Sequence, residues 1–320
     1  MNYDIIGDIH GQAEKLANLL KKMGYCKNKN GVWNHSERQV IFLGDFIDRG
    51  QHQLATIKIA RDMVEAGAAL AILGNHELNA IAWHTPHPKR KGEFLRPRPP
   101  HQSGDKNRHQ HQAFLNEVEH LPHTHKDIID WFKTLPLWLD LPGIRVVHAC
   151  WHQQYMDFLK PHLAPDGTIP QALLHDATNK PDPLTEEDKA TPSIFEAIET
   201  LCKGMEIDLP PGHSFVDKDG HERFNTRVRW WDKSAITYRQ ASLLPDTDLQ
   251  KLPDLTIPEQ ARLNFPIDKP IFFGHYWMTG SPSLLSENVA CLDYSAGKGG
   301  DLVAYRWDGE AKLDNSKFIF

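Results

Sequence analysis

Short apolar runs alternate with amphipathic stretches along the first third of the chain. The runs are Tyr3–Gly7, Val40–Gly44 and Ala69–Gly74. One helical face is formed after the first run by Leu16, Leu19, Leu20 and Met23, and after the second by Leu54, Ile57, Ala60 and Val64. A third helix is expected over His76–Trp83. Buried strands that alternate with amphipathic helices are typical of β-α-β units, so the pattern predicts a largely parallel sheet.

This alternation stops after Thr85, where proline, histidine, lysine and arginine dominate as far as about Arg108. Such a composition predicts an exposed insertion or long loop at about residues 85–110. Strand-like runs return later in the chain and end it, at Ile144–Val147, Ile271–Gly274, Val289–Tyr294 and Leu302–Trp307.

The region between about residues 160 and 268 is rich in proline and acidic residues. Weak helices are expected near Gln171–His175 and Thr185–Leu201, and Asp217–Gly220 is typical of a hairpin turn. We interpret this region as a cap on a single catalytic domain that spans residues 1–320.

Composition excludes several classes of protein. The 320 residues carry a net charge of −6, so no basic field exists for non-specific binding to nucleic acid. The sequence shows no signal peptide and no run of about eighteen apolar residues, which favours a cytoplasmic protein that does not bind membranes. Reduced thiols are expected at the scattered Cys26, Cys150, Cys202 and Cys291.

Five apolar runs end in a residue type that binds metal ions. The pairs are Gly7-Asp8, Gly44-Asp45, Gly74-Asn75, Val147-His148 and Gly274-His275, and glycine precedes the ligand type in four of the five. Strands of an α/β sheet present ligands at their carboxyl ends, where glycine permits a sharp turn or close approach. His10 joins the set because residues two apart on an extended chain point the same way.

The predicted metal ligands are therefore Asp8, His10, Asp45, Asn75, His148 and His275. Carboxylate, imidazole and amide ligands without a thiolate favour two divalent cations over a structural zinc site. Mn²⁺ is preferred, with iron, Zn²⁺ and Mg²⁺ as alternatives. A carboxylate such as Asp45 can bridge two cations about 3.5–4 Å apart.

These blocks resemble those of the calcineurin-like metallophosphoesterases. The blocks are Gly7-Asp8-Ile9-His10-Gly11, Gly44-Asp45-Phe46-Ile47-Asp48-Arg49-Gly50, Gly74-Asn75-His76-Glu77, Val147-His148-Ala149 and Gly274-His275. Their order matches, and five together are far more specific than one. The resemblance spans most of the chain except the cap. It implies a four-layer α/β/β/α sandwich with two mixed β-sheets and an elaborated cap.

Within this family the chain is similar to the phosphoprotein-phosphatase and symmetrical diadenosine-tetraphosphate-hydrolase branch. Asp48-Arg49-Gly50 points there, as does Trp277, where other branches carry a second histidine. The closing stretch from Cys291 through Gly300 to Arg306 also looks like that branch. Loss of the second histidine would leave one metal with fewer protein ligands.

The resemblance also implies a role for each site residue. Asp8, His10 and Asp45 would hold one metal, and Asp45, Asn75, His148 and His275 the other. A bridging hydroxide would attack phosphorus in line. Arg49 would bind the phosphoryl oxygens together with Asn75 and His76, and His76 would protonate the leaving oxygen while Asp48 holds its ring. One further phosphate-binding cation is expected; Arg229 is favoured, with Arg227 next.

Simpler interpretations exist for single residues. Asp8 or Asp45 alone resembles a helix cap, His148 a core histidine, and Cys150 a small buried filler. His152 is expected on a helix surface. The eight histidines between His84 and His125 have irregular spacing, which favours a solvated insertion over a further metal site.

Aromatic side chains offer a wall for base stacking, although most tryptophans fill cores. The candidates are Trp83, Trp151, Tyr155, Trp230, Trp231, Tyr276 and Trp277.

Two substrate classes remain open, a dinucleoside polyphosphate and a phosphoprotein, beside a small phosphate ester. The stretch Leu73–Trp83 fits the first, whereas Glu77 fits the second, because hydrolases of the first kind more often carry aspartate there. The rival functions are a non-catalytic scaffold with the same fold and a nuclease of the same superfamily.

Overall fold

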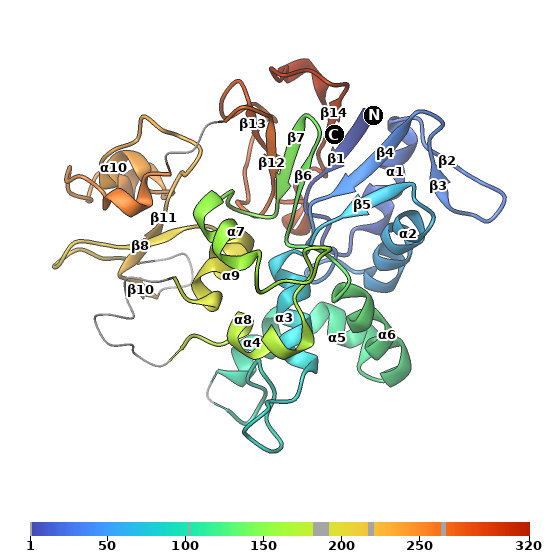
Figure 1. Cartoon of the computed structure of the whole chain (residues 1–320), viewed down its shortest axis with the longest axis horizontal. Helices are drawn as coiled ribbons and strands as arrows, with labels where there is room; N and C mark the ends of the chain where they lie inside the picture. Colours follow the sequence, from blue (N-terminus) through green and yellow to red (C-terminus); the bar gives the residue numbers. More distant parts are fainter. Residues whose placement is uncertain (1, 102, 182–191, 217–220, 264–266) are drawn as a thin grey trace.

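Two mixed β-sheets form the centre of the molecule (Figure 1). The computed structural model describes residues 2–101, 103–181, 192–216, 221–263 and 267–320. The first sheet contains, in spatial order, β15 (Phe318–Ile319), β14 (Ala304–Trp307), β1 (Asn2–Ile6), β4 (Arg38–Phe42) and β5 (Ala69–Ala71). The second contains β13 (Val289–Cys291), β12 (Ile271–Phe273), β7 (Ile144–Val147) and β6 (Trp138–Leu141).

The strand directions confirm the β-α-β prediction for the first third of the chain. β1, β4 and β5 are parallel, whereas β14 and β15 add antiparallel edges. In the second sheet β12 is parallel to both neighbours and β6 is antiparallel to β7. Helices flank the two sheets in Figure 1, so the predicted fold class is confirmed.

Alternate residues of the strands supply two separate cores, because successive side chains of a strand point to opposite faces. Ile5, Ile41 and Phe272 belong to the core that both sheets share. Ile6, Phe42 and Phe273 belong to the core that includes the helices. These helices include α1 (Ala13–Lys22), α2 (Gln53–Glu65) and α3 (Asn75–His84), as the periodicity predicts. A small hairpin of β2 (Cys26–Lys27) and β3 (Trp33–Asn34) lies between α1 and β4 in the chain.

The insertion is more ordered than its composition predicts. Within its predicted bounds of about 85–110, an isolated bridge pairs Pro86 with Phe94 and α4 spans Gly104–Gln110. Two further helices follow the insertion, α5 (Gln112–Val118) and α6 (Pro122–Phe132). The prediction of a solvated histidine-rich segment is wrong for His87, His111 and His125, which are all buried. Their rings pack among aromatic and imidazole neighbours instead of facing water.

The predicted cap contains short elements. They are α7 (Gln153–Leu159), η1 (Gln171–Leu173), α8 (Leu174–Thr178), α9 (Ile194–Lys203), β8 (Glu206–Asp208), β9 (Phe215–Val216), β10 (Glu222–Arg223), β11 (Asn225–Arg227), α10 (Tyr238–Ala241), α11 (Asp246–Leu249) and η3 (Glu259–Ala261). Two further turns near the end are η4 (Ala296–Lys298) and η5 (Asn315–Lys317). The predicted turn at Asp217–Gly220 and the first part of the helix predicted at Thr185–Leu201 lie outside the described residues.

Two single-residue predictions near α7 have opposite outcomes. Cys150 is buried as a small filler, as expected. His152 is not a surface residue: it is buried at the start of α7, stacks on Tyr155 and accepts a hydrogen bond from the Tyr155 backbone N–H.

All four cysteines are free thiols. That residues 1–320 form a single catalytic domain stays a prediction. Among the described residues, no helix combines the length and the apolar character needed to cross a membrane.

Candidate metal centre

Six predicted ligands meet where the carboxyl ends of the two sheets converge. The first sheet supplies Asp8 and His10 after β1, Asp45 after β4, and Asn75 at the start of α3; the second supplies His148 after β7 and His275 after β12. Backbone hydrogen bonds fix these loops together. The His10 N–H donates to the Asp45 carbonyl at 2.8 Å, and the Gly274 N–H donates to the His148 carbonyl at 2.8 Å.

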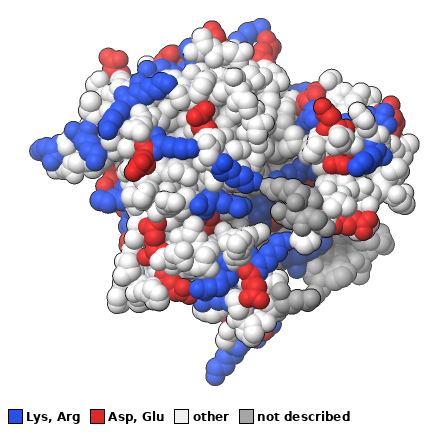
Figure 2. Space-filling view, turned by 180° about the vertical axis from the view of Figure 1, so that it is seen from behind, with Lys and Arg blue, Asp and Glu red and all other residues white. Residues whose placement is uncertain are grey.

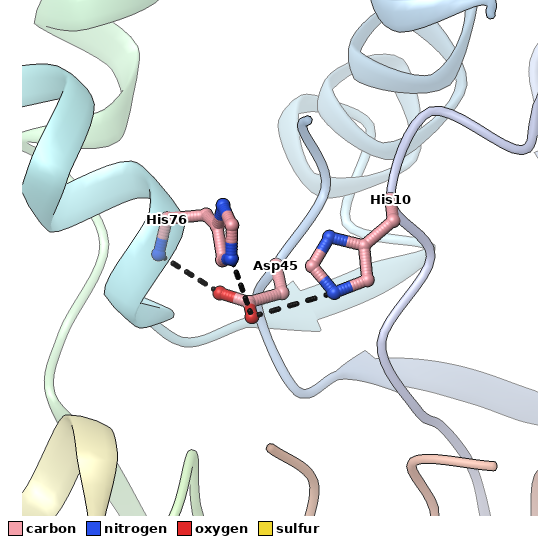
Figure 3. Close-up of side chains that lie close together, drawn as sticks. All are labelled: His10, Asp45 and His76. Atoms are coloured by element: carbon pink, nitrogen blue, oxygen red, sulfur yellow. Dashed lines mark hydrogen bonds and ion pairs between the residues drawn. The ribbon is translucent and has the colours of Figure 1, made fainter. Parts of the chain in front are cut away.

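Asp45 lies at the middle of this cluster. Its Oδ2 is 3.4 Å from Nε2 of His148, 3.7 Å from Nε2 of His10 and 3.9 Å from Nε2 of His76. Figure 3 shows the rings of His10 and His76 on either side of the carboxylate. The other oxygen, Oδ1, accepts the His76 backbone N–H at 3.0 Å. One carboxylate oxygen therefore faces three imidazole nitrogens.

Asn75 and Asp8 complete the cluster. Oδ1 of Asn75 is 2.8 Å from Nδ1 of His275 and 3.1 Å from Nε2 of His148. Oδ2 of Asp8 accepts the His275 backbone N–H at 3.0 Å. Possible ligand atoms form two groups, and within each group all of the atoms lie within 4.8 Å of one another. The first group is His10, Asp45 and His76, and the second is Asp45, His148 and His275. Asp45 is common to both groups, whereas His76 stands where the sequence predicts Asp8.

The unsatisfied atoms at this site fit a bound cation. Oδ1 of Asp8, Nε2 of His10 and Nε2 of His275 are buried and have no hydrogen-bond partner within the described part of the chain. Nδ1 of His10 donates to the Ile47 carbonyl at 2.8 Å, and Nδ1 of His148 donates to the Leu43 carbonyl at 2.7 Å. In His10 this bond leaves the Nε2 lone pair free in the neutral tautomer, which is the arrangement typical of a metal-binding histidine. Nε2 of His148 instead lies 3.1 Å from Oδ1 of Asn75 and 3.4 Å from Oδ2 of Asp45.

Burial and neighbouring charges shift the pKa values of acidic and basic side chains in the cluster. Burial and the nearby Asp293 raise the pKa of Asp8 well above its usual value. Burial and His76 lower the pKa of His10 to about 4. Although burial opposes it, Asp45 raises the pKa of His148 to about 10. A cation in contact with Asp8 and His10 would favour the ionised carboxylate and the neutral imidazole, which is what ligation requires.

The backbone is strained around the same point. Seven non-glycine residues have a positive φ among those the structure describes, and six belong to this site: His10 (50°), Asp45 (51°), Asp48 (69°), Arg49 (69°), His275 (71°) and Trp277 (51°). Positive φ disfavours L-residues, and such strain clusters at functional sites.

Glycine is required beside two of the ligands. Gly44 has φ of 88°, and a Cβ there would collide with the backbone of Gly74. A Cβ on Gly274 would overlap Oδ1 of Asp8. The expectation that glycine permits close approach at these strand ends is confirmed at both positions.

His76 is held by Asp48, and Asp48 also binds a histidine that the sequence prediction missed. Nδ1 of His76 lies 2.5 Å from Oδ2 of Asp48, and Nδ1 of His111 lies 2.8 Å from Oδ1. Although burial opposes it, the two imidazoles lower the pKa of Asp48 below its usual range. Despite burial, Asp45 and Asp48 raise the pKa of His76. No local sequence pattern could indicate this contact, because 63 residues separate His111 from Asp48.

Glu77 has a structural position. It is fully buried, and its carboxylate accepts the backbone N–H groups of Asp45 at 2.8 Å, Phe46 at 2.8 Å and Gly74 at 3.2 Å. These bonds fix the loop after β4 against the start of α3. Because Glu77 does not face the cavity described next, it gives no information about the substrate.

A cavity of about 300 Å³ opens beside the cluster. It is lined by Asp45, Asp48, Arg49, Asn75, His76, Asn79, Arg96, Gln110, His111, Lys203, Arg227, His275 and Trp277. We call it the central cavity. Of the two arginines considered as the second phosphate-binding cation, Arg227 lines it, whereas Arg229 lines a separate cavity next to α7.

Trp277 stands at the position where the resemblance implies a second histidine in other branches of the family. Its ring stacks on His10 with centroids 5.2 Å apart, and the guanidinium of Arg49 lies 5.5 Å from its centroid. Of the other aromatic candidates, Trp83, Trp151, Trp230, Trp231 and Tyr276 are buried and Tyr155 is half-buried. Trp277 is the member of that set that lines the central cavity in the described structure.

The chain belongs to the calcineurin-like phosphoesterase family, whose sequence model matches residues 1–209. This confirms the resemblance seen in the motifs. A symmetrical bis(5′-nucleosyl)-tetraphosphatase of Vibrio cholerae is 26% identical over 316 residues, which cover 96% of this chain and 95% of that protein. An asymmetrical bis(5′-nucleosyl)-tetraphosphatase of Oceanobacillus iheyensis is 47% identical over 77 residues, but the match spans 24% of this chain and 30% of that protein.

Solved structures with a similar fold include a putative diadenosine tetraphosphatase, with 15% identity, a TM-score of 0.47 and coverage of 98% of this chain and 91% of that chain. A cold-active protein-tyrosine phosphatase of a Shewanella species has 18% identity, a TM-score of 0.48 and coverage of 97% and 78%.

Proposed function

We propose that this protein is a dinuclear-metal phosphoesterase that hydrolyses phosphomonoester or phosphoanhydride bonds by in-line displacement. One observation carries the proposal: Oδ2 of Asp45 faces Nε2 of His10, His76 and His148, beside buried ligand atoms that lack partners. A carboxylate shared by two groups of possible ligands, as Asp45 is, is the arrangement expected of a bridging ligand.

Asp8, His10 and Asp45 would hold one cation, and Asp45, Asn75, His148 and His275 the other. When bound, the cations would supply positive charge to the phosphoryl oxygens and lower the pKa of a water nucleophile. The ligand atoms are all oxygen or nitrogen, which suits Mn²⁺, iron, Zn²⁺ or Mg²⁺ better than a thiolate-bound structural zinc; Mn²⁺ is our preferred metal, with the other three as alternatives.

The chain's own side chains would bind the substrate and transfer the proton. Arg49 and Arg227 line the central cavity and would bind the phosphoryl oxygens. Nε2 of His76 lies 3.9 Å from Oδ2 of Asp45, and both residues line the central cavity. We assign to this nitrogen the proton donated to the leaving oxygen. Asp48 would orient the ring through its bond to Nδ1. Charge stabilisation and positioning of this kind are what phosphoryl transfer needs.

Among the substrate classes, a dinucleoside polyphosphate is favoured. The match to the symmetrical tetraphosphatase of Vibrio cholerae extends over 96% of this chain, and thus includes the cap. A phosphoprotein is the second candidate, and a small phosphate ester the third.

The Asp45→Asn variant tests the bridging role. We expect it to reduce Mn²⁺-dependent hydrolysis of p-nitrophenyl phosphate by at least about a thousandfold, because the bridging charge is lost while the shape is kept. The matched control is Asp62→Asn, on the outer part of α2 where Asp62 pairs with Lys58, and it should keep full activity. Undiminished activity of Asp45→Asn, in protein that unfolds at the usual temperature, would reject the proposal. A chain that retains metal but turns over none of a panel of phosphate esters and anhydrides would be a scaffold.

A further inference from the structure

A second cavity adjoins the central one. Its volume is about 340 Å³, and it shares Asn79, Arg96 and Lys203 with the central cavity. Its walls come from α3, from the insertion and α4, and from α8 and α9 of the cap. We call it the side cavity. Because three residues line both, the two cavities meet at these side chains.

Arg96 is fixed at this junction. Its backbone N–H donates to the Ala82 carbonyl of α3 at 3.0 Å, and its Nη2 donates to Oε1 of Gln110 at 2.8 Å. Its Nε is buried and finds no hydrogen-bond acceptor anywhere in the described ranges. Arg96 lines both cavities, and a guanidinium held in place there is suited to bind an oxyanion, because its planar fork matches carboxylate and phosphate oxygens.

The charges around Arg96 come from both cavities. Burial lowers the pKa of Arg96, and the carboxylates of Asp48 and Glu199 oppose this change. Asp48 lines the central cavity and Glu199 the side cavity. Lys203 forms an ion pair with Glu199 on α9 and also lines both cavities. The junction therefore presents two cationic side chains from different parts of the chain.

The central cavity contains two basic side chains beyond the two that the proposed function uses, although Glu199 pairs with Lys203 and Glu206 with Arg227. Arg49 and Arg227 already line the central cavity, so with Arg96 and Lys203 four Lys and Arg side chains surround it among the described residues. Figure 2 shows that basic side chains also gather around a hollow near the middle of one face of the molecule, although the net charge is −6. A substrate with a second anionic group would use the extra pair.

The side cavity has room and chemistry for an organic group next to that anion. Phe195 offers a half-buried ring, and Asn107 and Thr178 offer hydrogen-bonding groups. Aromatic rings stack on bases, and amides and hydroxyls bind the polar edges of a base or a sugar.

We propose that Arg96 and Lys203 form a second anion subsite, which binds a phosphate group of the leaving part of a nucleoside polyphosphate while its nucleoside enters the side cavity. This inference rests on the proposed phosphoesterase function. It makes the insertion and the cap responsible for the choice between polyphosphates and simple monoesters.

The test compares two substrates on the metal-loaded full chain, diadenosine tetraphosphate and p-nitrophenyl phosphate. We expect Arg96→Gln to lower the ratio of their kcat/KM values by about 30-fold, because a charge-assisted hydrogen bond to the polyphosphate is lost. Lys203→Gln should lower the same ratio. The matched control is Arg90→Gln, an exposed arginine of the same insertion that pairs with Glu93, and it should leave both kcat/KM values unchanged. An unchanged ratio in Arg96→Gln and Lys203→Gln would overturn the subsite, even if both substrates are hydrolysed.

A binding measurement keeps this test separate from the proposed function. Calorimetry with methylenediphosphonate and methylphosphonate measures the contribution of the second anionic group without turnover. We expect the unaltered protein to prefer the diphosphonate by at least about tenfold, and Arg96→Gln to lose that preference. An equal preference in both proteins would reject the subsite. Absence of hydrolysis together with a lost preference would reject the catalytic proposal and support the subsite.

Discussion

The Asp48 carboxylate is hydrogen-bonded to two imidazoles at once. Oδ2 binds His76 and Oδ1 binds His111, so His111 has no direct contact with the metal cluster but fixes the carboxylate that orients His76. His111 is 3% exposed, and its Nε2 has no partner in the described residues. Its main polar contact is therefore the one with Asp48, and we assign it a positioning role that acts through that residue.

Replacement of His111 by glutamine should affect proton donation more than substrate binding. We expect kcat for phenyl phosphate, which has a poor leaving group, to fall about 10-fold with little change in KM. The loss should be smaller for 2,4-dinitrophenyl phosphate, whose leaving group needs no proton. The control is His109→Gln, an exposed histidine on α4. A leaving-group series in which His111→Gln slows all members equally would show that His111 acts only on the fold.

The sequence predicts the positions of some site residues better than those of others. Asp8 and Asp45 each follow a short buried strand, and the carboxyl ends of neighbouring parallel strands meet, so their convergence was predictable. His111 lies in a segment whose spacing carries no period. Arg229 was favoured over Arg227, but β11 ends at Arg227. The chain beyond it is no longer a regular strand, so spacing alone could not decide which arginine faces the site.

Helices α5 and α6, which follow the insertion, support the loops that carry the site. Glu117 of α5 accepts the backbone N–H groups of Gln53 at 2.6 Å and Leu54 at 3.0 Å, at the start of α2. Gln53 in turn accepts the Asp48 N–H at 2.7 Å. The spacing of the histidines as far as His125 favoured a solvated segment, yet Ile128, Ile129 and Phe132 bury one face of α6, the helix that includes His125. Packing against α3 therefore overrides the composition.

Acid should weaken this packing through His125 of α6. His125 is buried beside His84 of α3 and Phe114 of α5, and the charges of His84, His111 and Arg98 also act on it, opposed by Glu119. Burial, with these cations, lowers the pKa of His125 to about 4. The unfolded chain takes up a proton there below pH of about 6.5, whereas the folded chain does so only near the lowered pKa, so folding stability falls as pH drops through this window.

The expected loss from His125 is about 2 kcal/mol between pH 7.5 and pH 5. It can be measured by urea unfolding of the unaltered protein and of His125→Gln at both pH values. The variant should lose less stability on acidification, even if it is less stable at pH 7.5. His123→Gln, at an exposed position of the same helix, should behave as the unaltered protein. An acid loss in His125→Gln as large as in the unaltered protein would place the titration elsewhere.

At the scale of the whole molecule, the candidate metal centre joins the two sheets. Asp8, Asp45 and Asn75 come from the side of the first sheet, and His148 and His275 follow strands of the second. The sequence predicted β1, β4, β5, β7 and β12 because these strands are short, apolar and followed by ligand types. The arrangement in two mixed sheets was implied by the family resemblance, and β6 and β15 were not predicted. The sequence of the cap shows few apolar runs of this kind. Its short elements depend on long-range contacts, such as the hydrogen bond that the Trp230 indole N–H donates to the Ala149 carbonyl at 3.0 Å.

A cation bound between the sheets should stabilise the folded chain, because only the folded state brings both sets of ligands together. At a free Mn²⁺ concentration of about 100 times Kd, linkage gives about 2.7 kcal/mol. For a chain of this size we expect Tm to rise by about 5 °C relative to chelator-treated protein. Asp45→Asn should lose most of the rise because both groups of ligands contain Asp45, whereas Asp62→Asn on α2 should keep it. A rise of equal size in Asp45→Asn would mean that the stabilising metal binds at another place, and the two sheets would then meet without a shared ion.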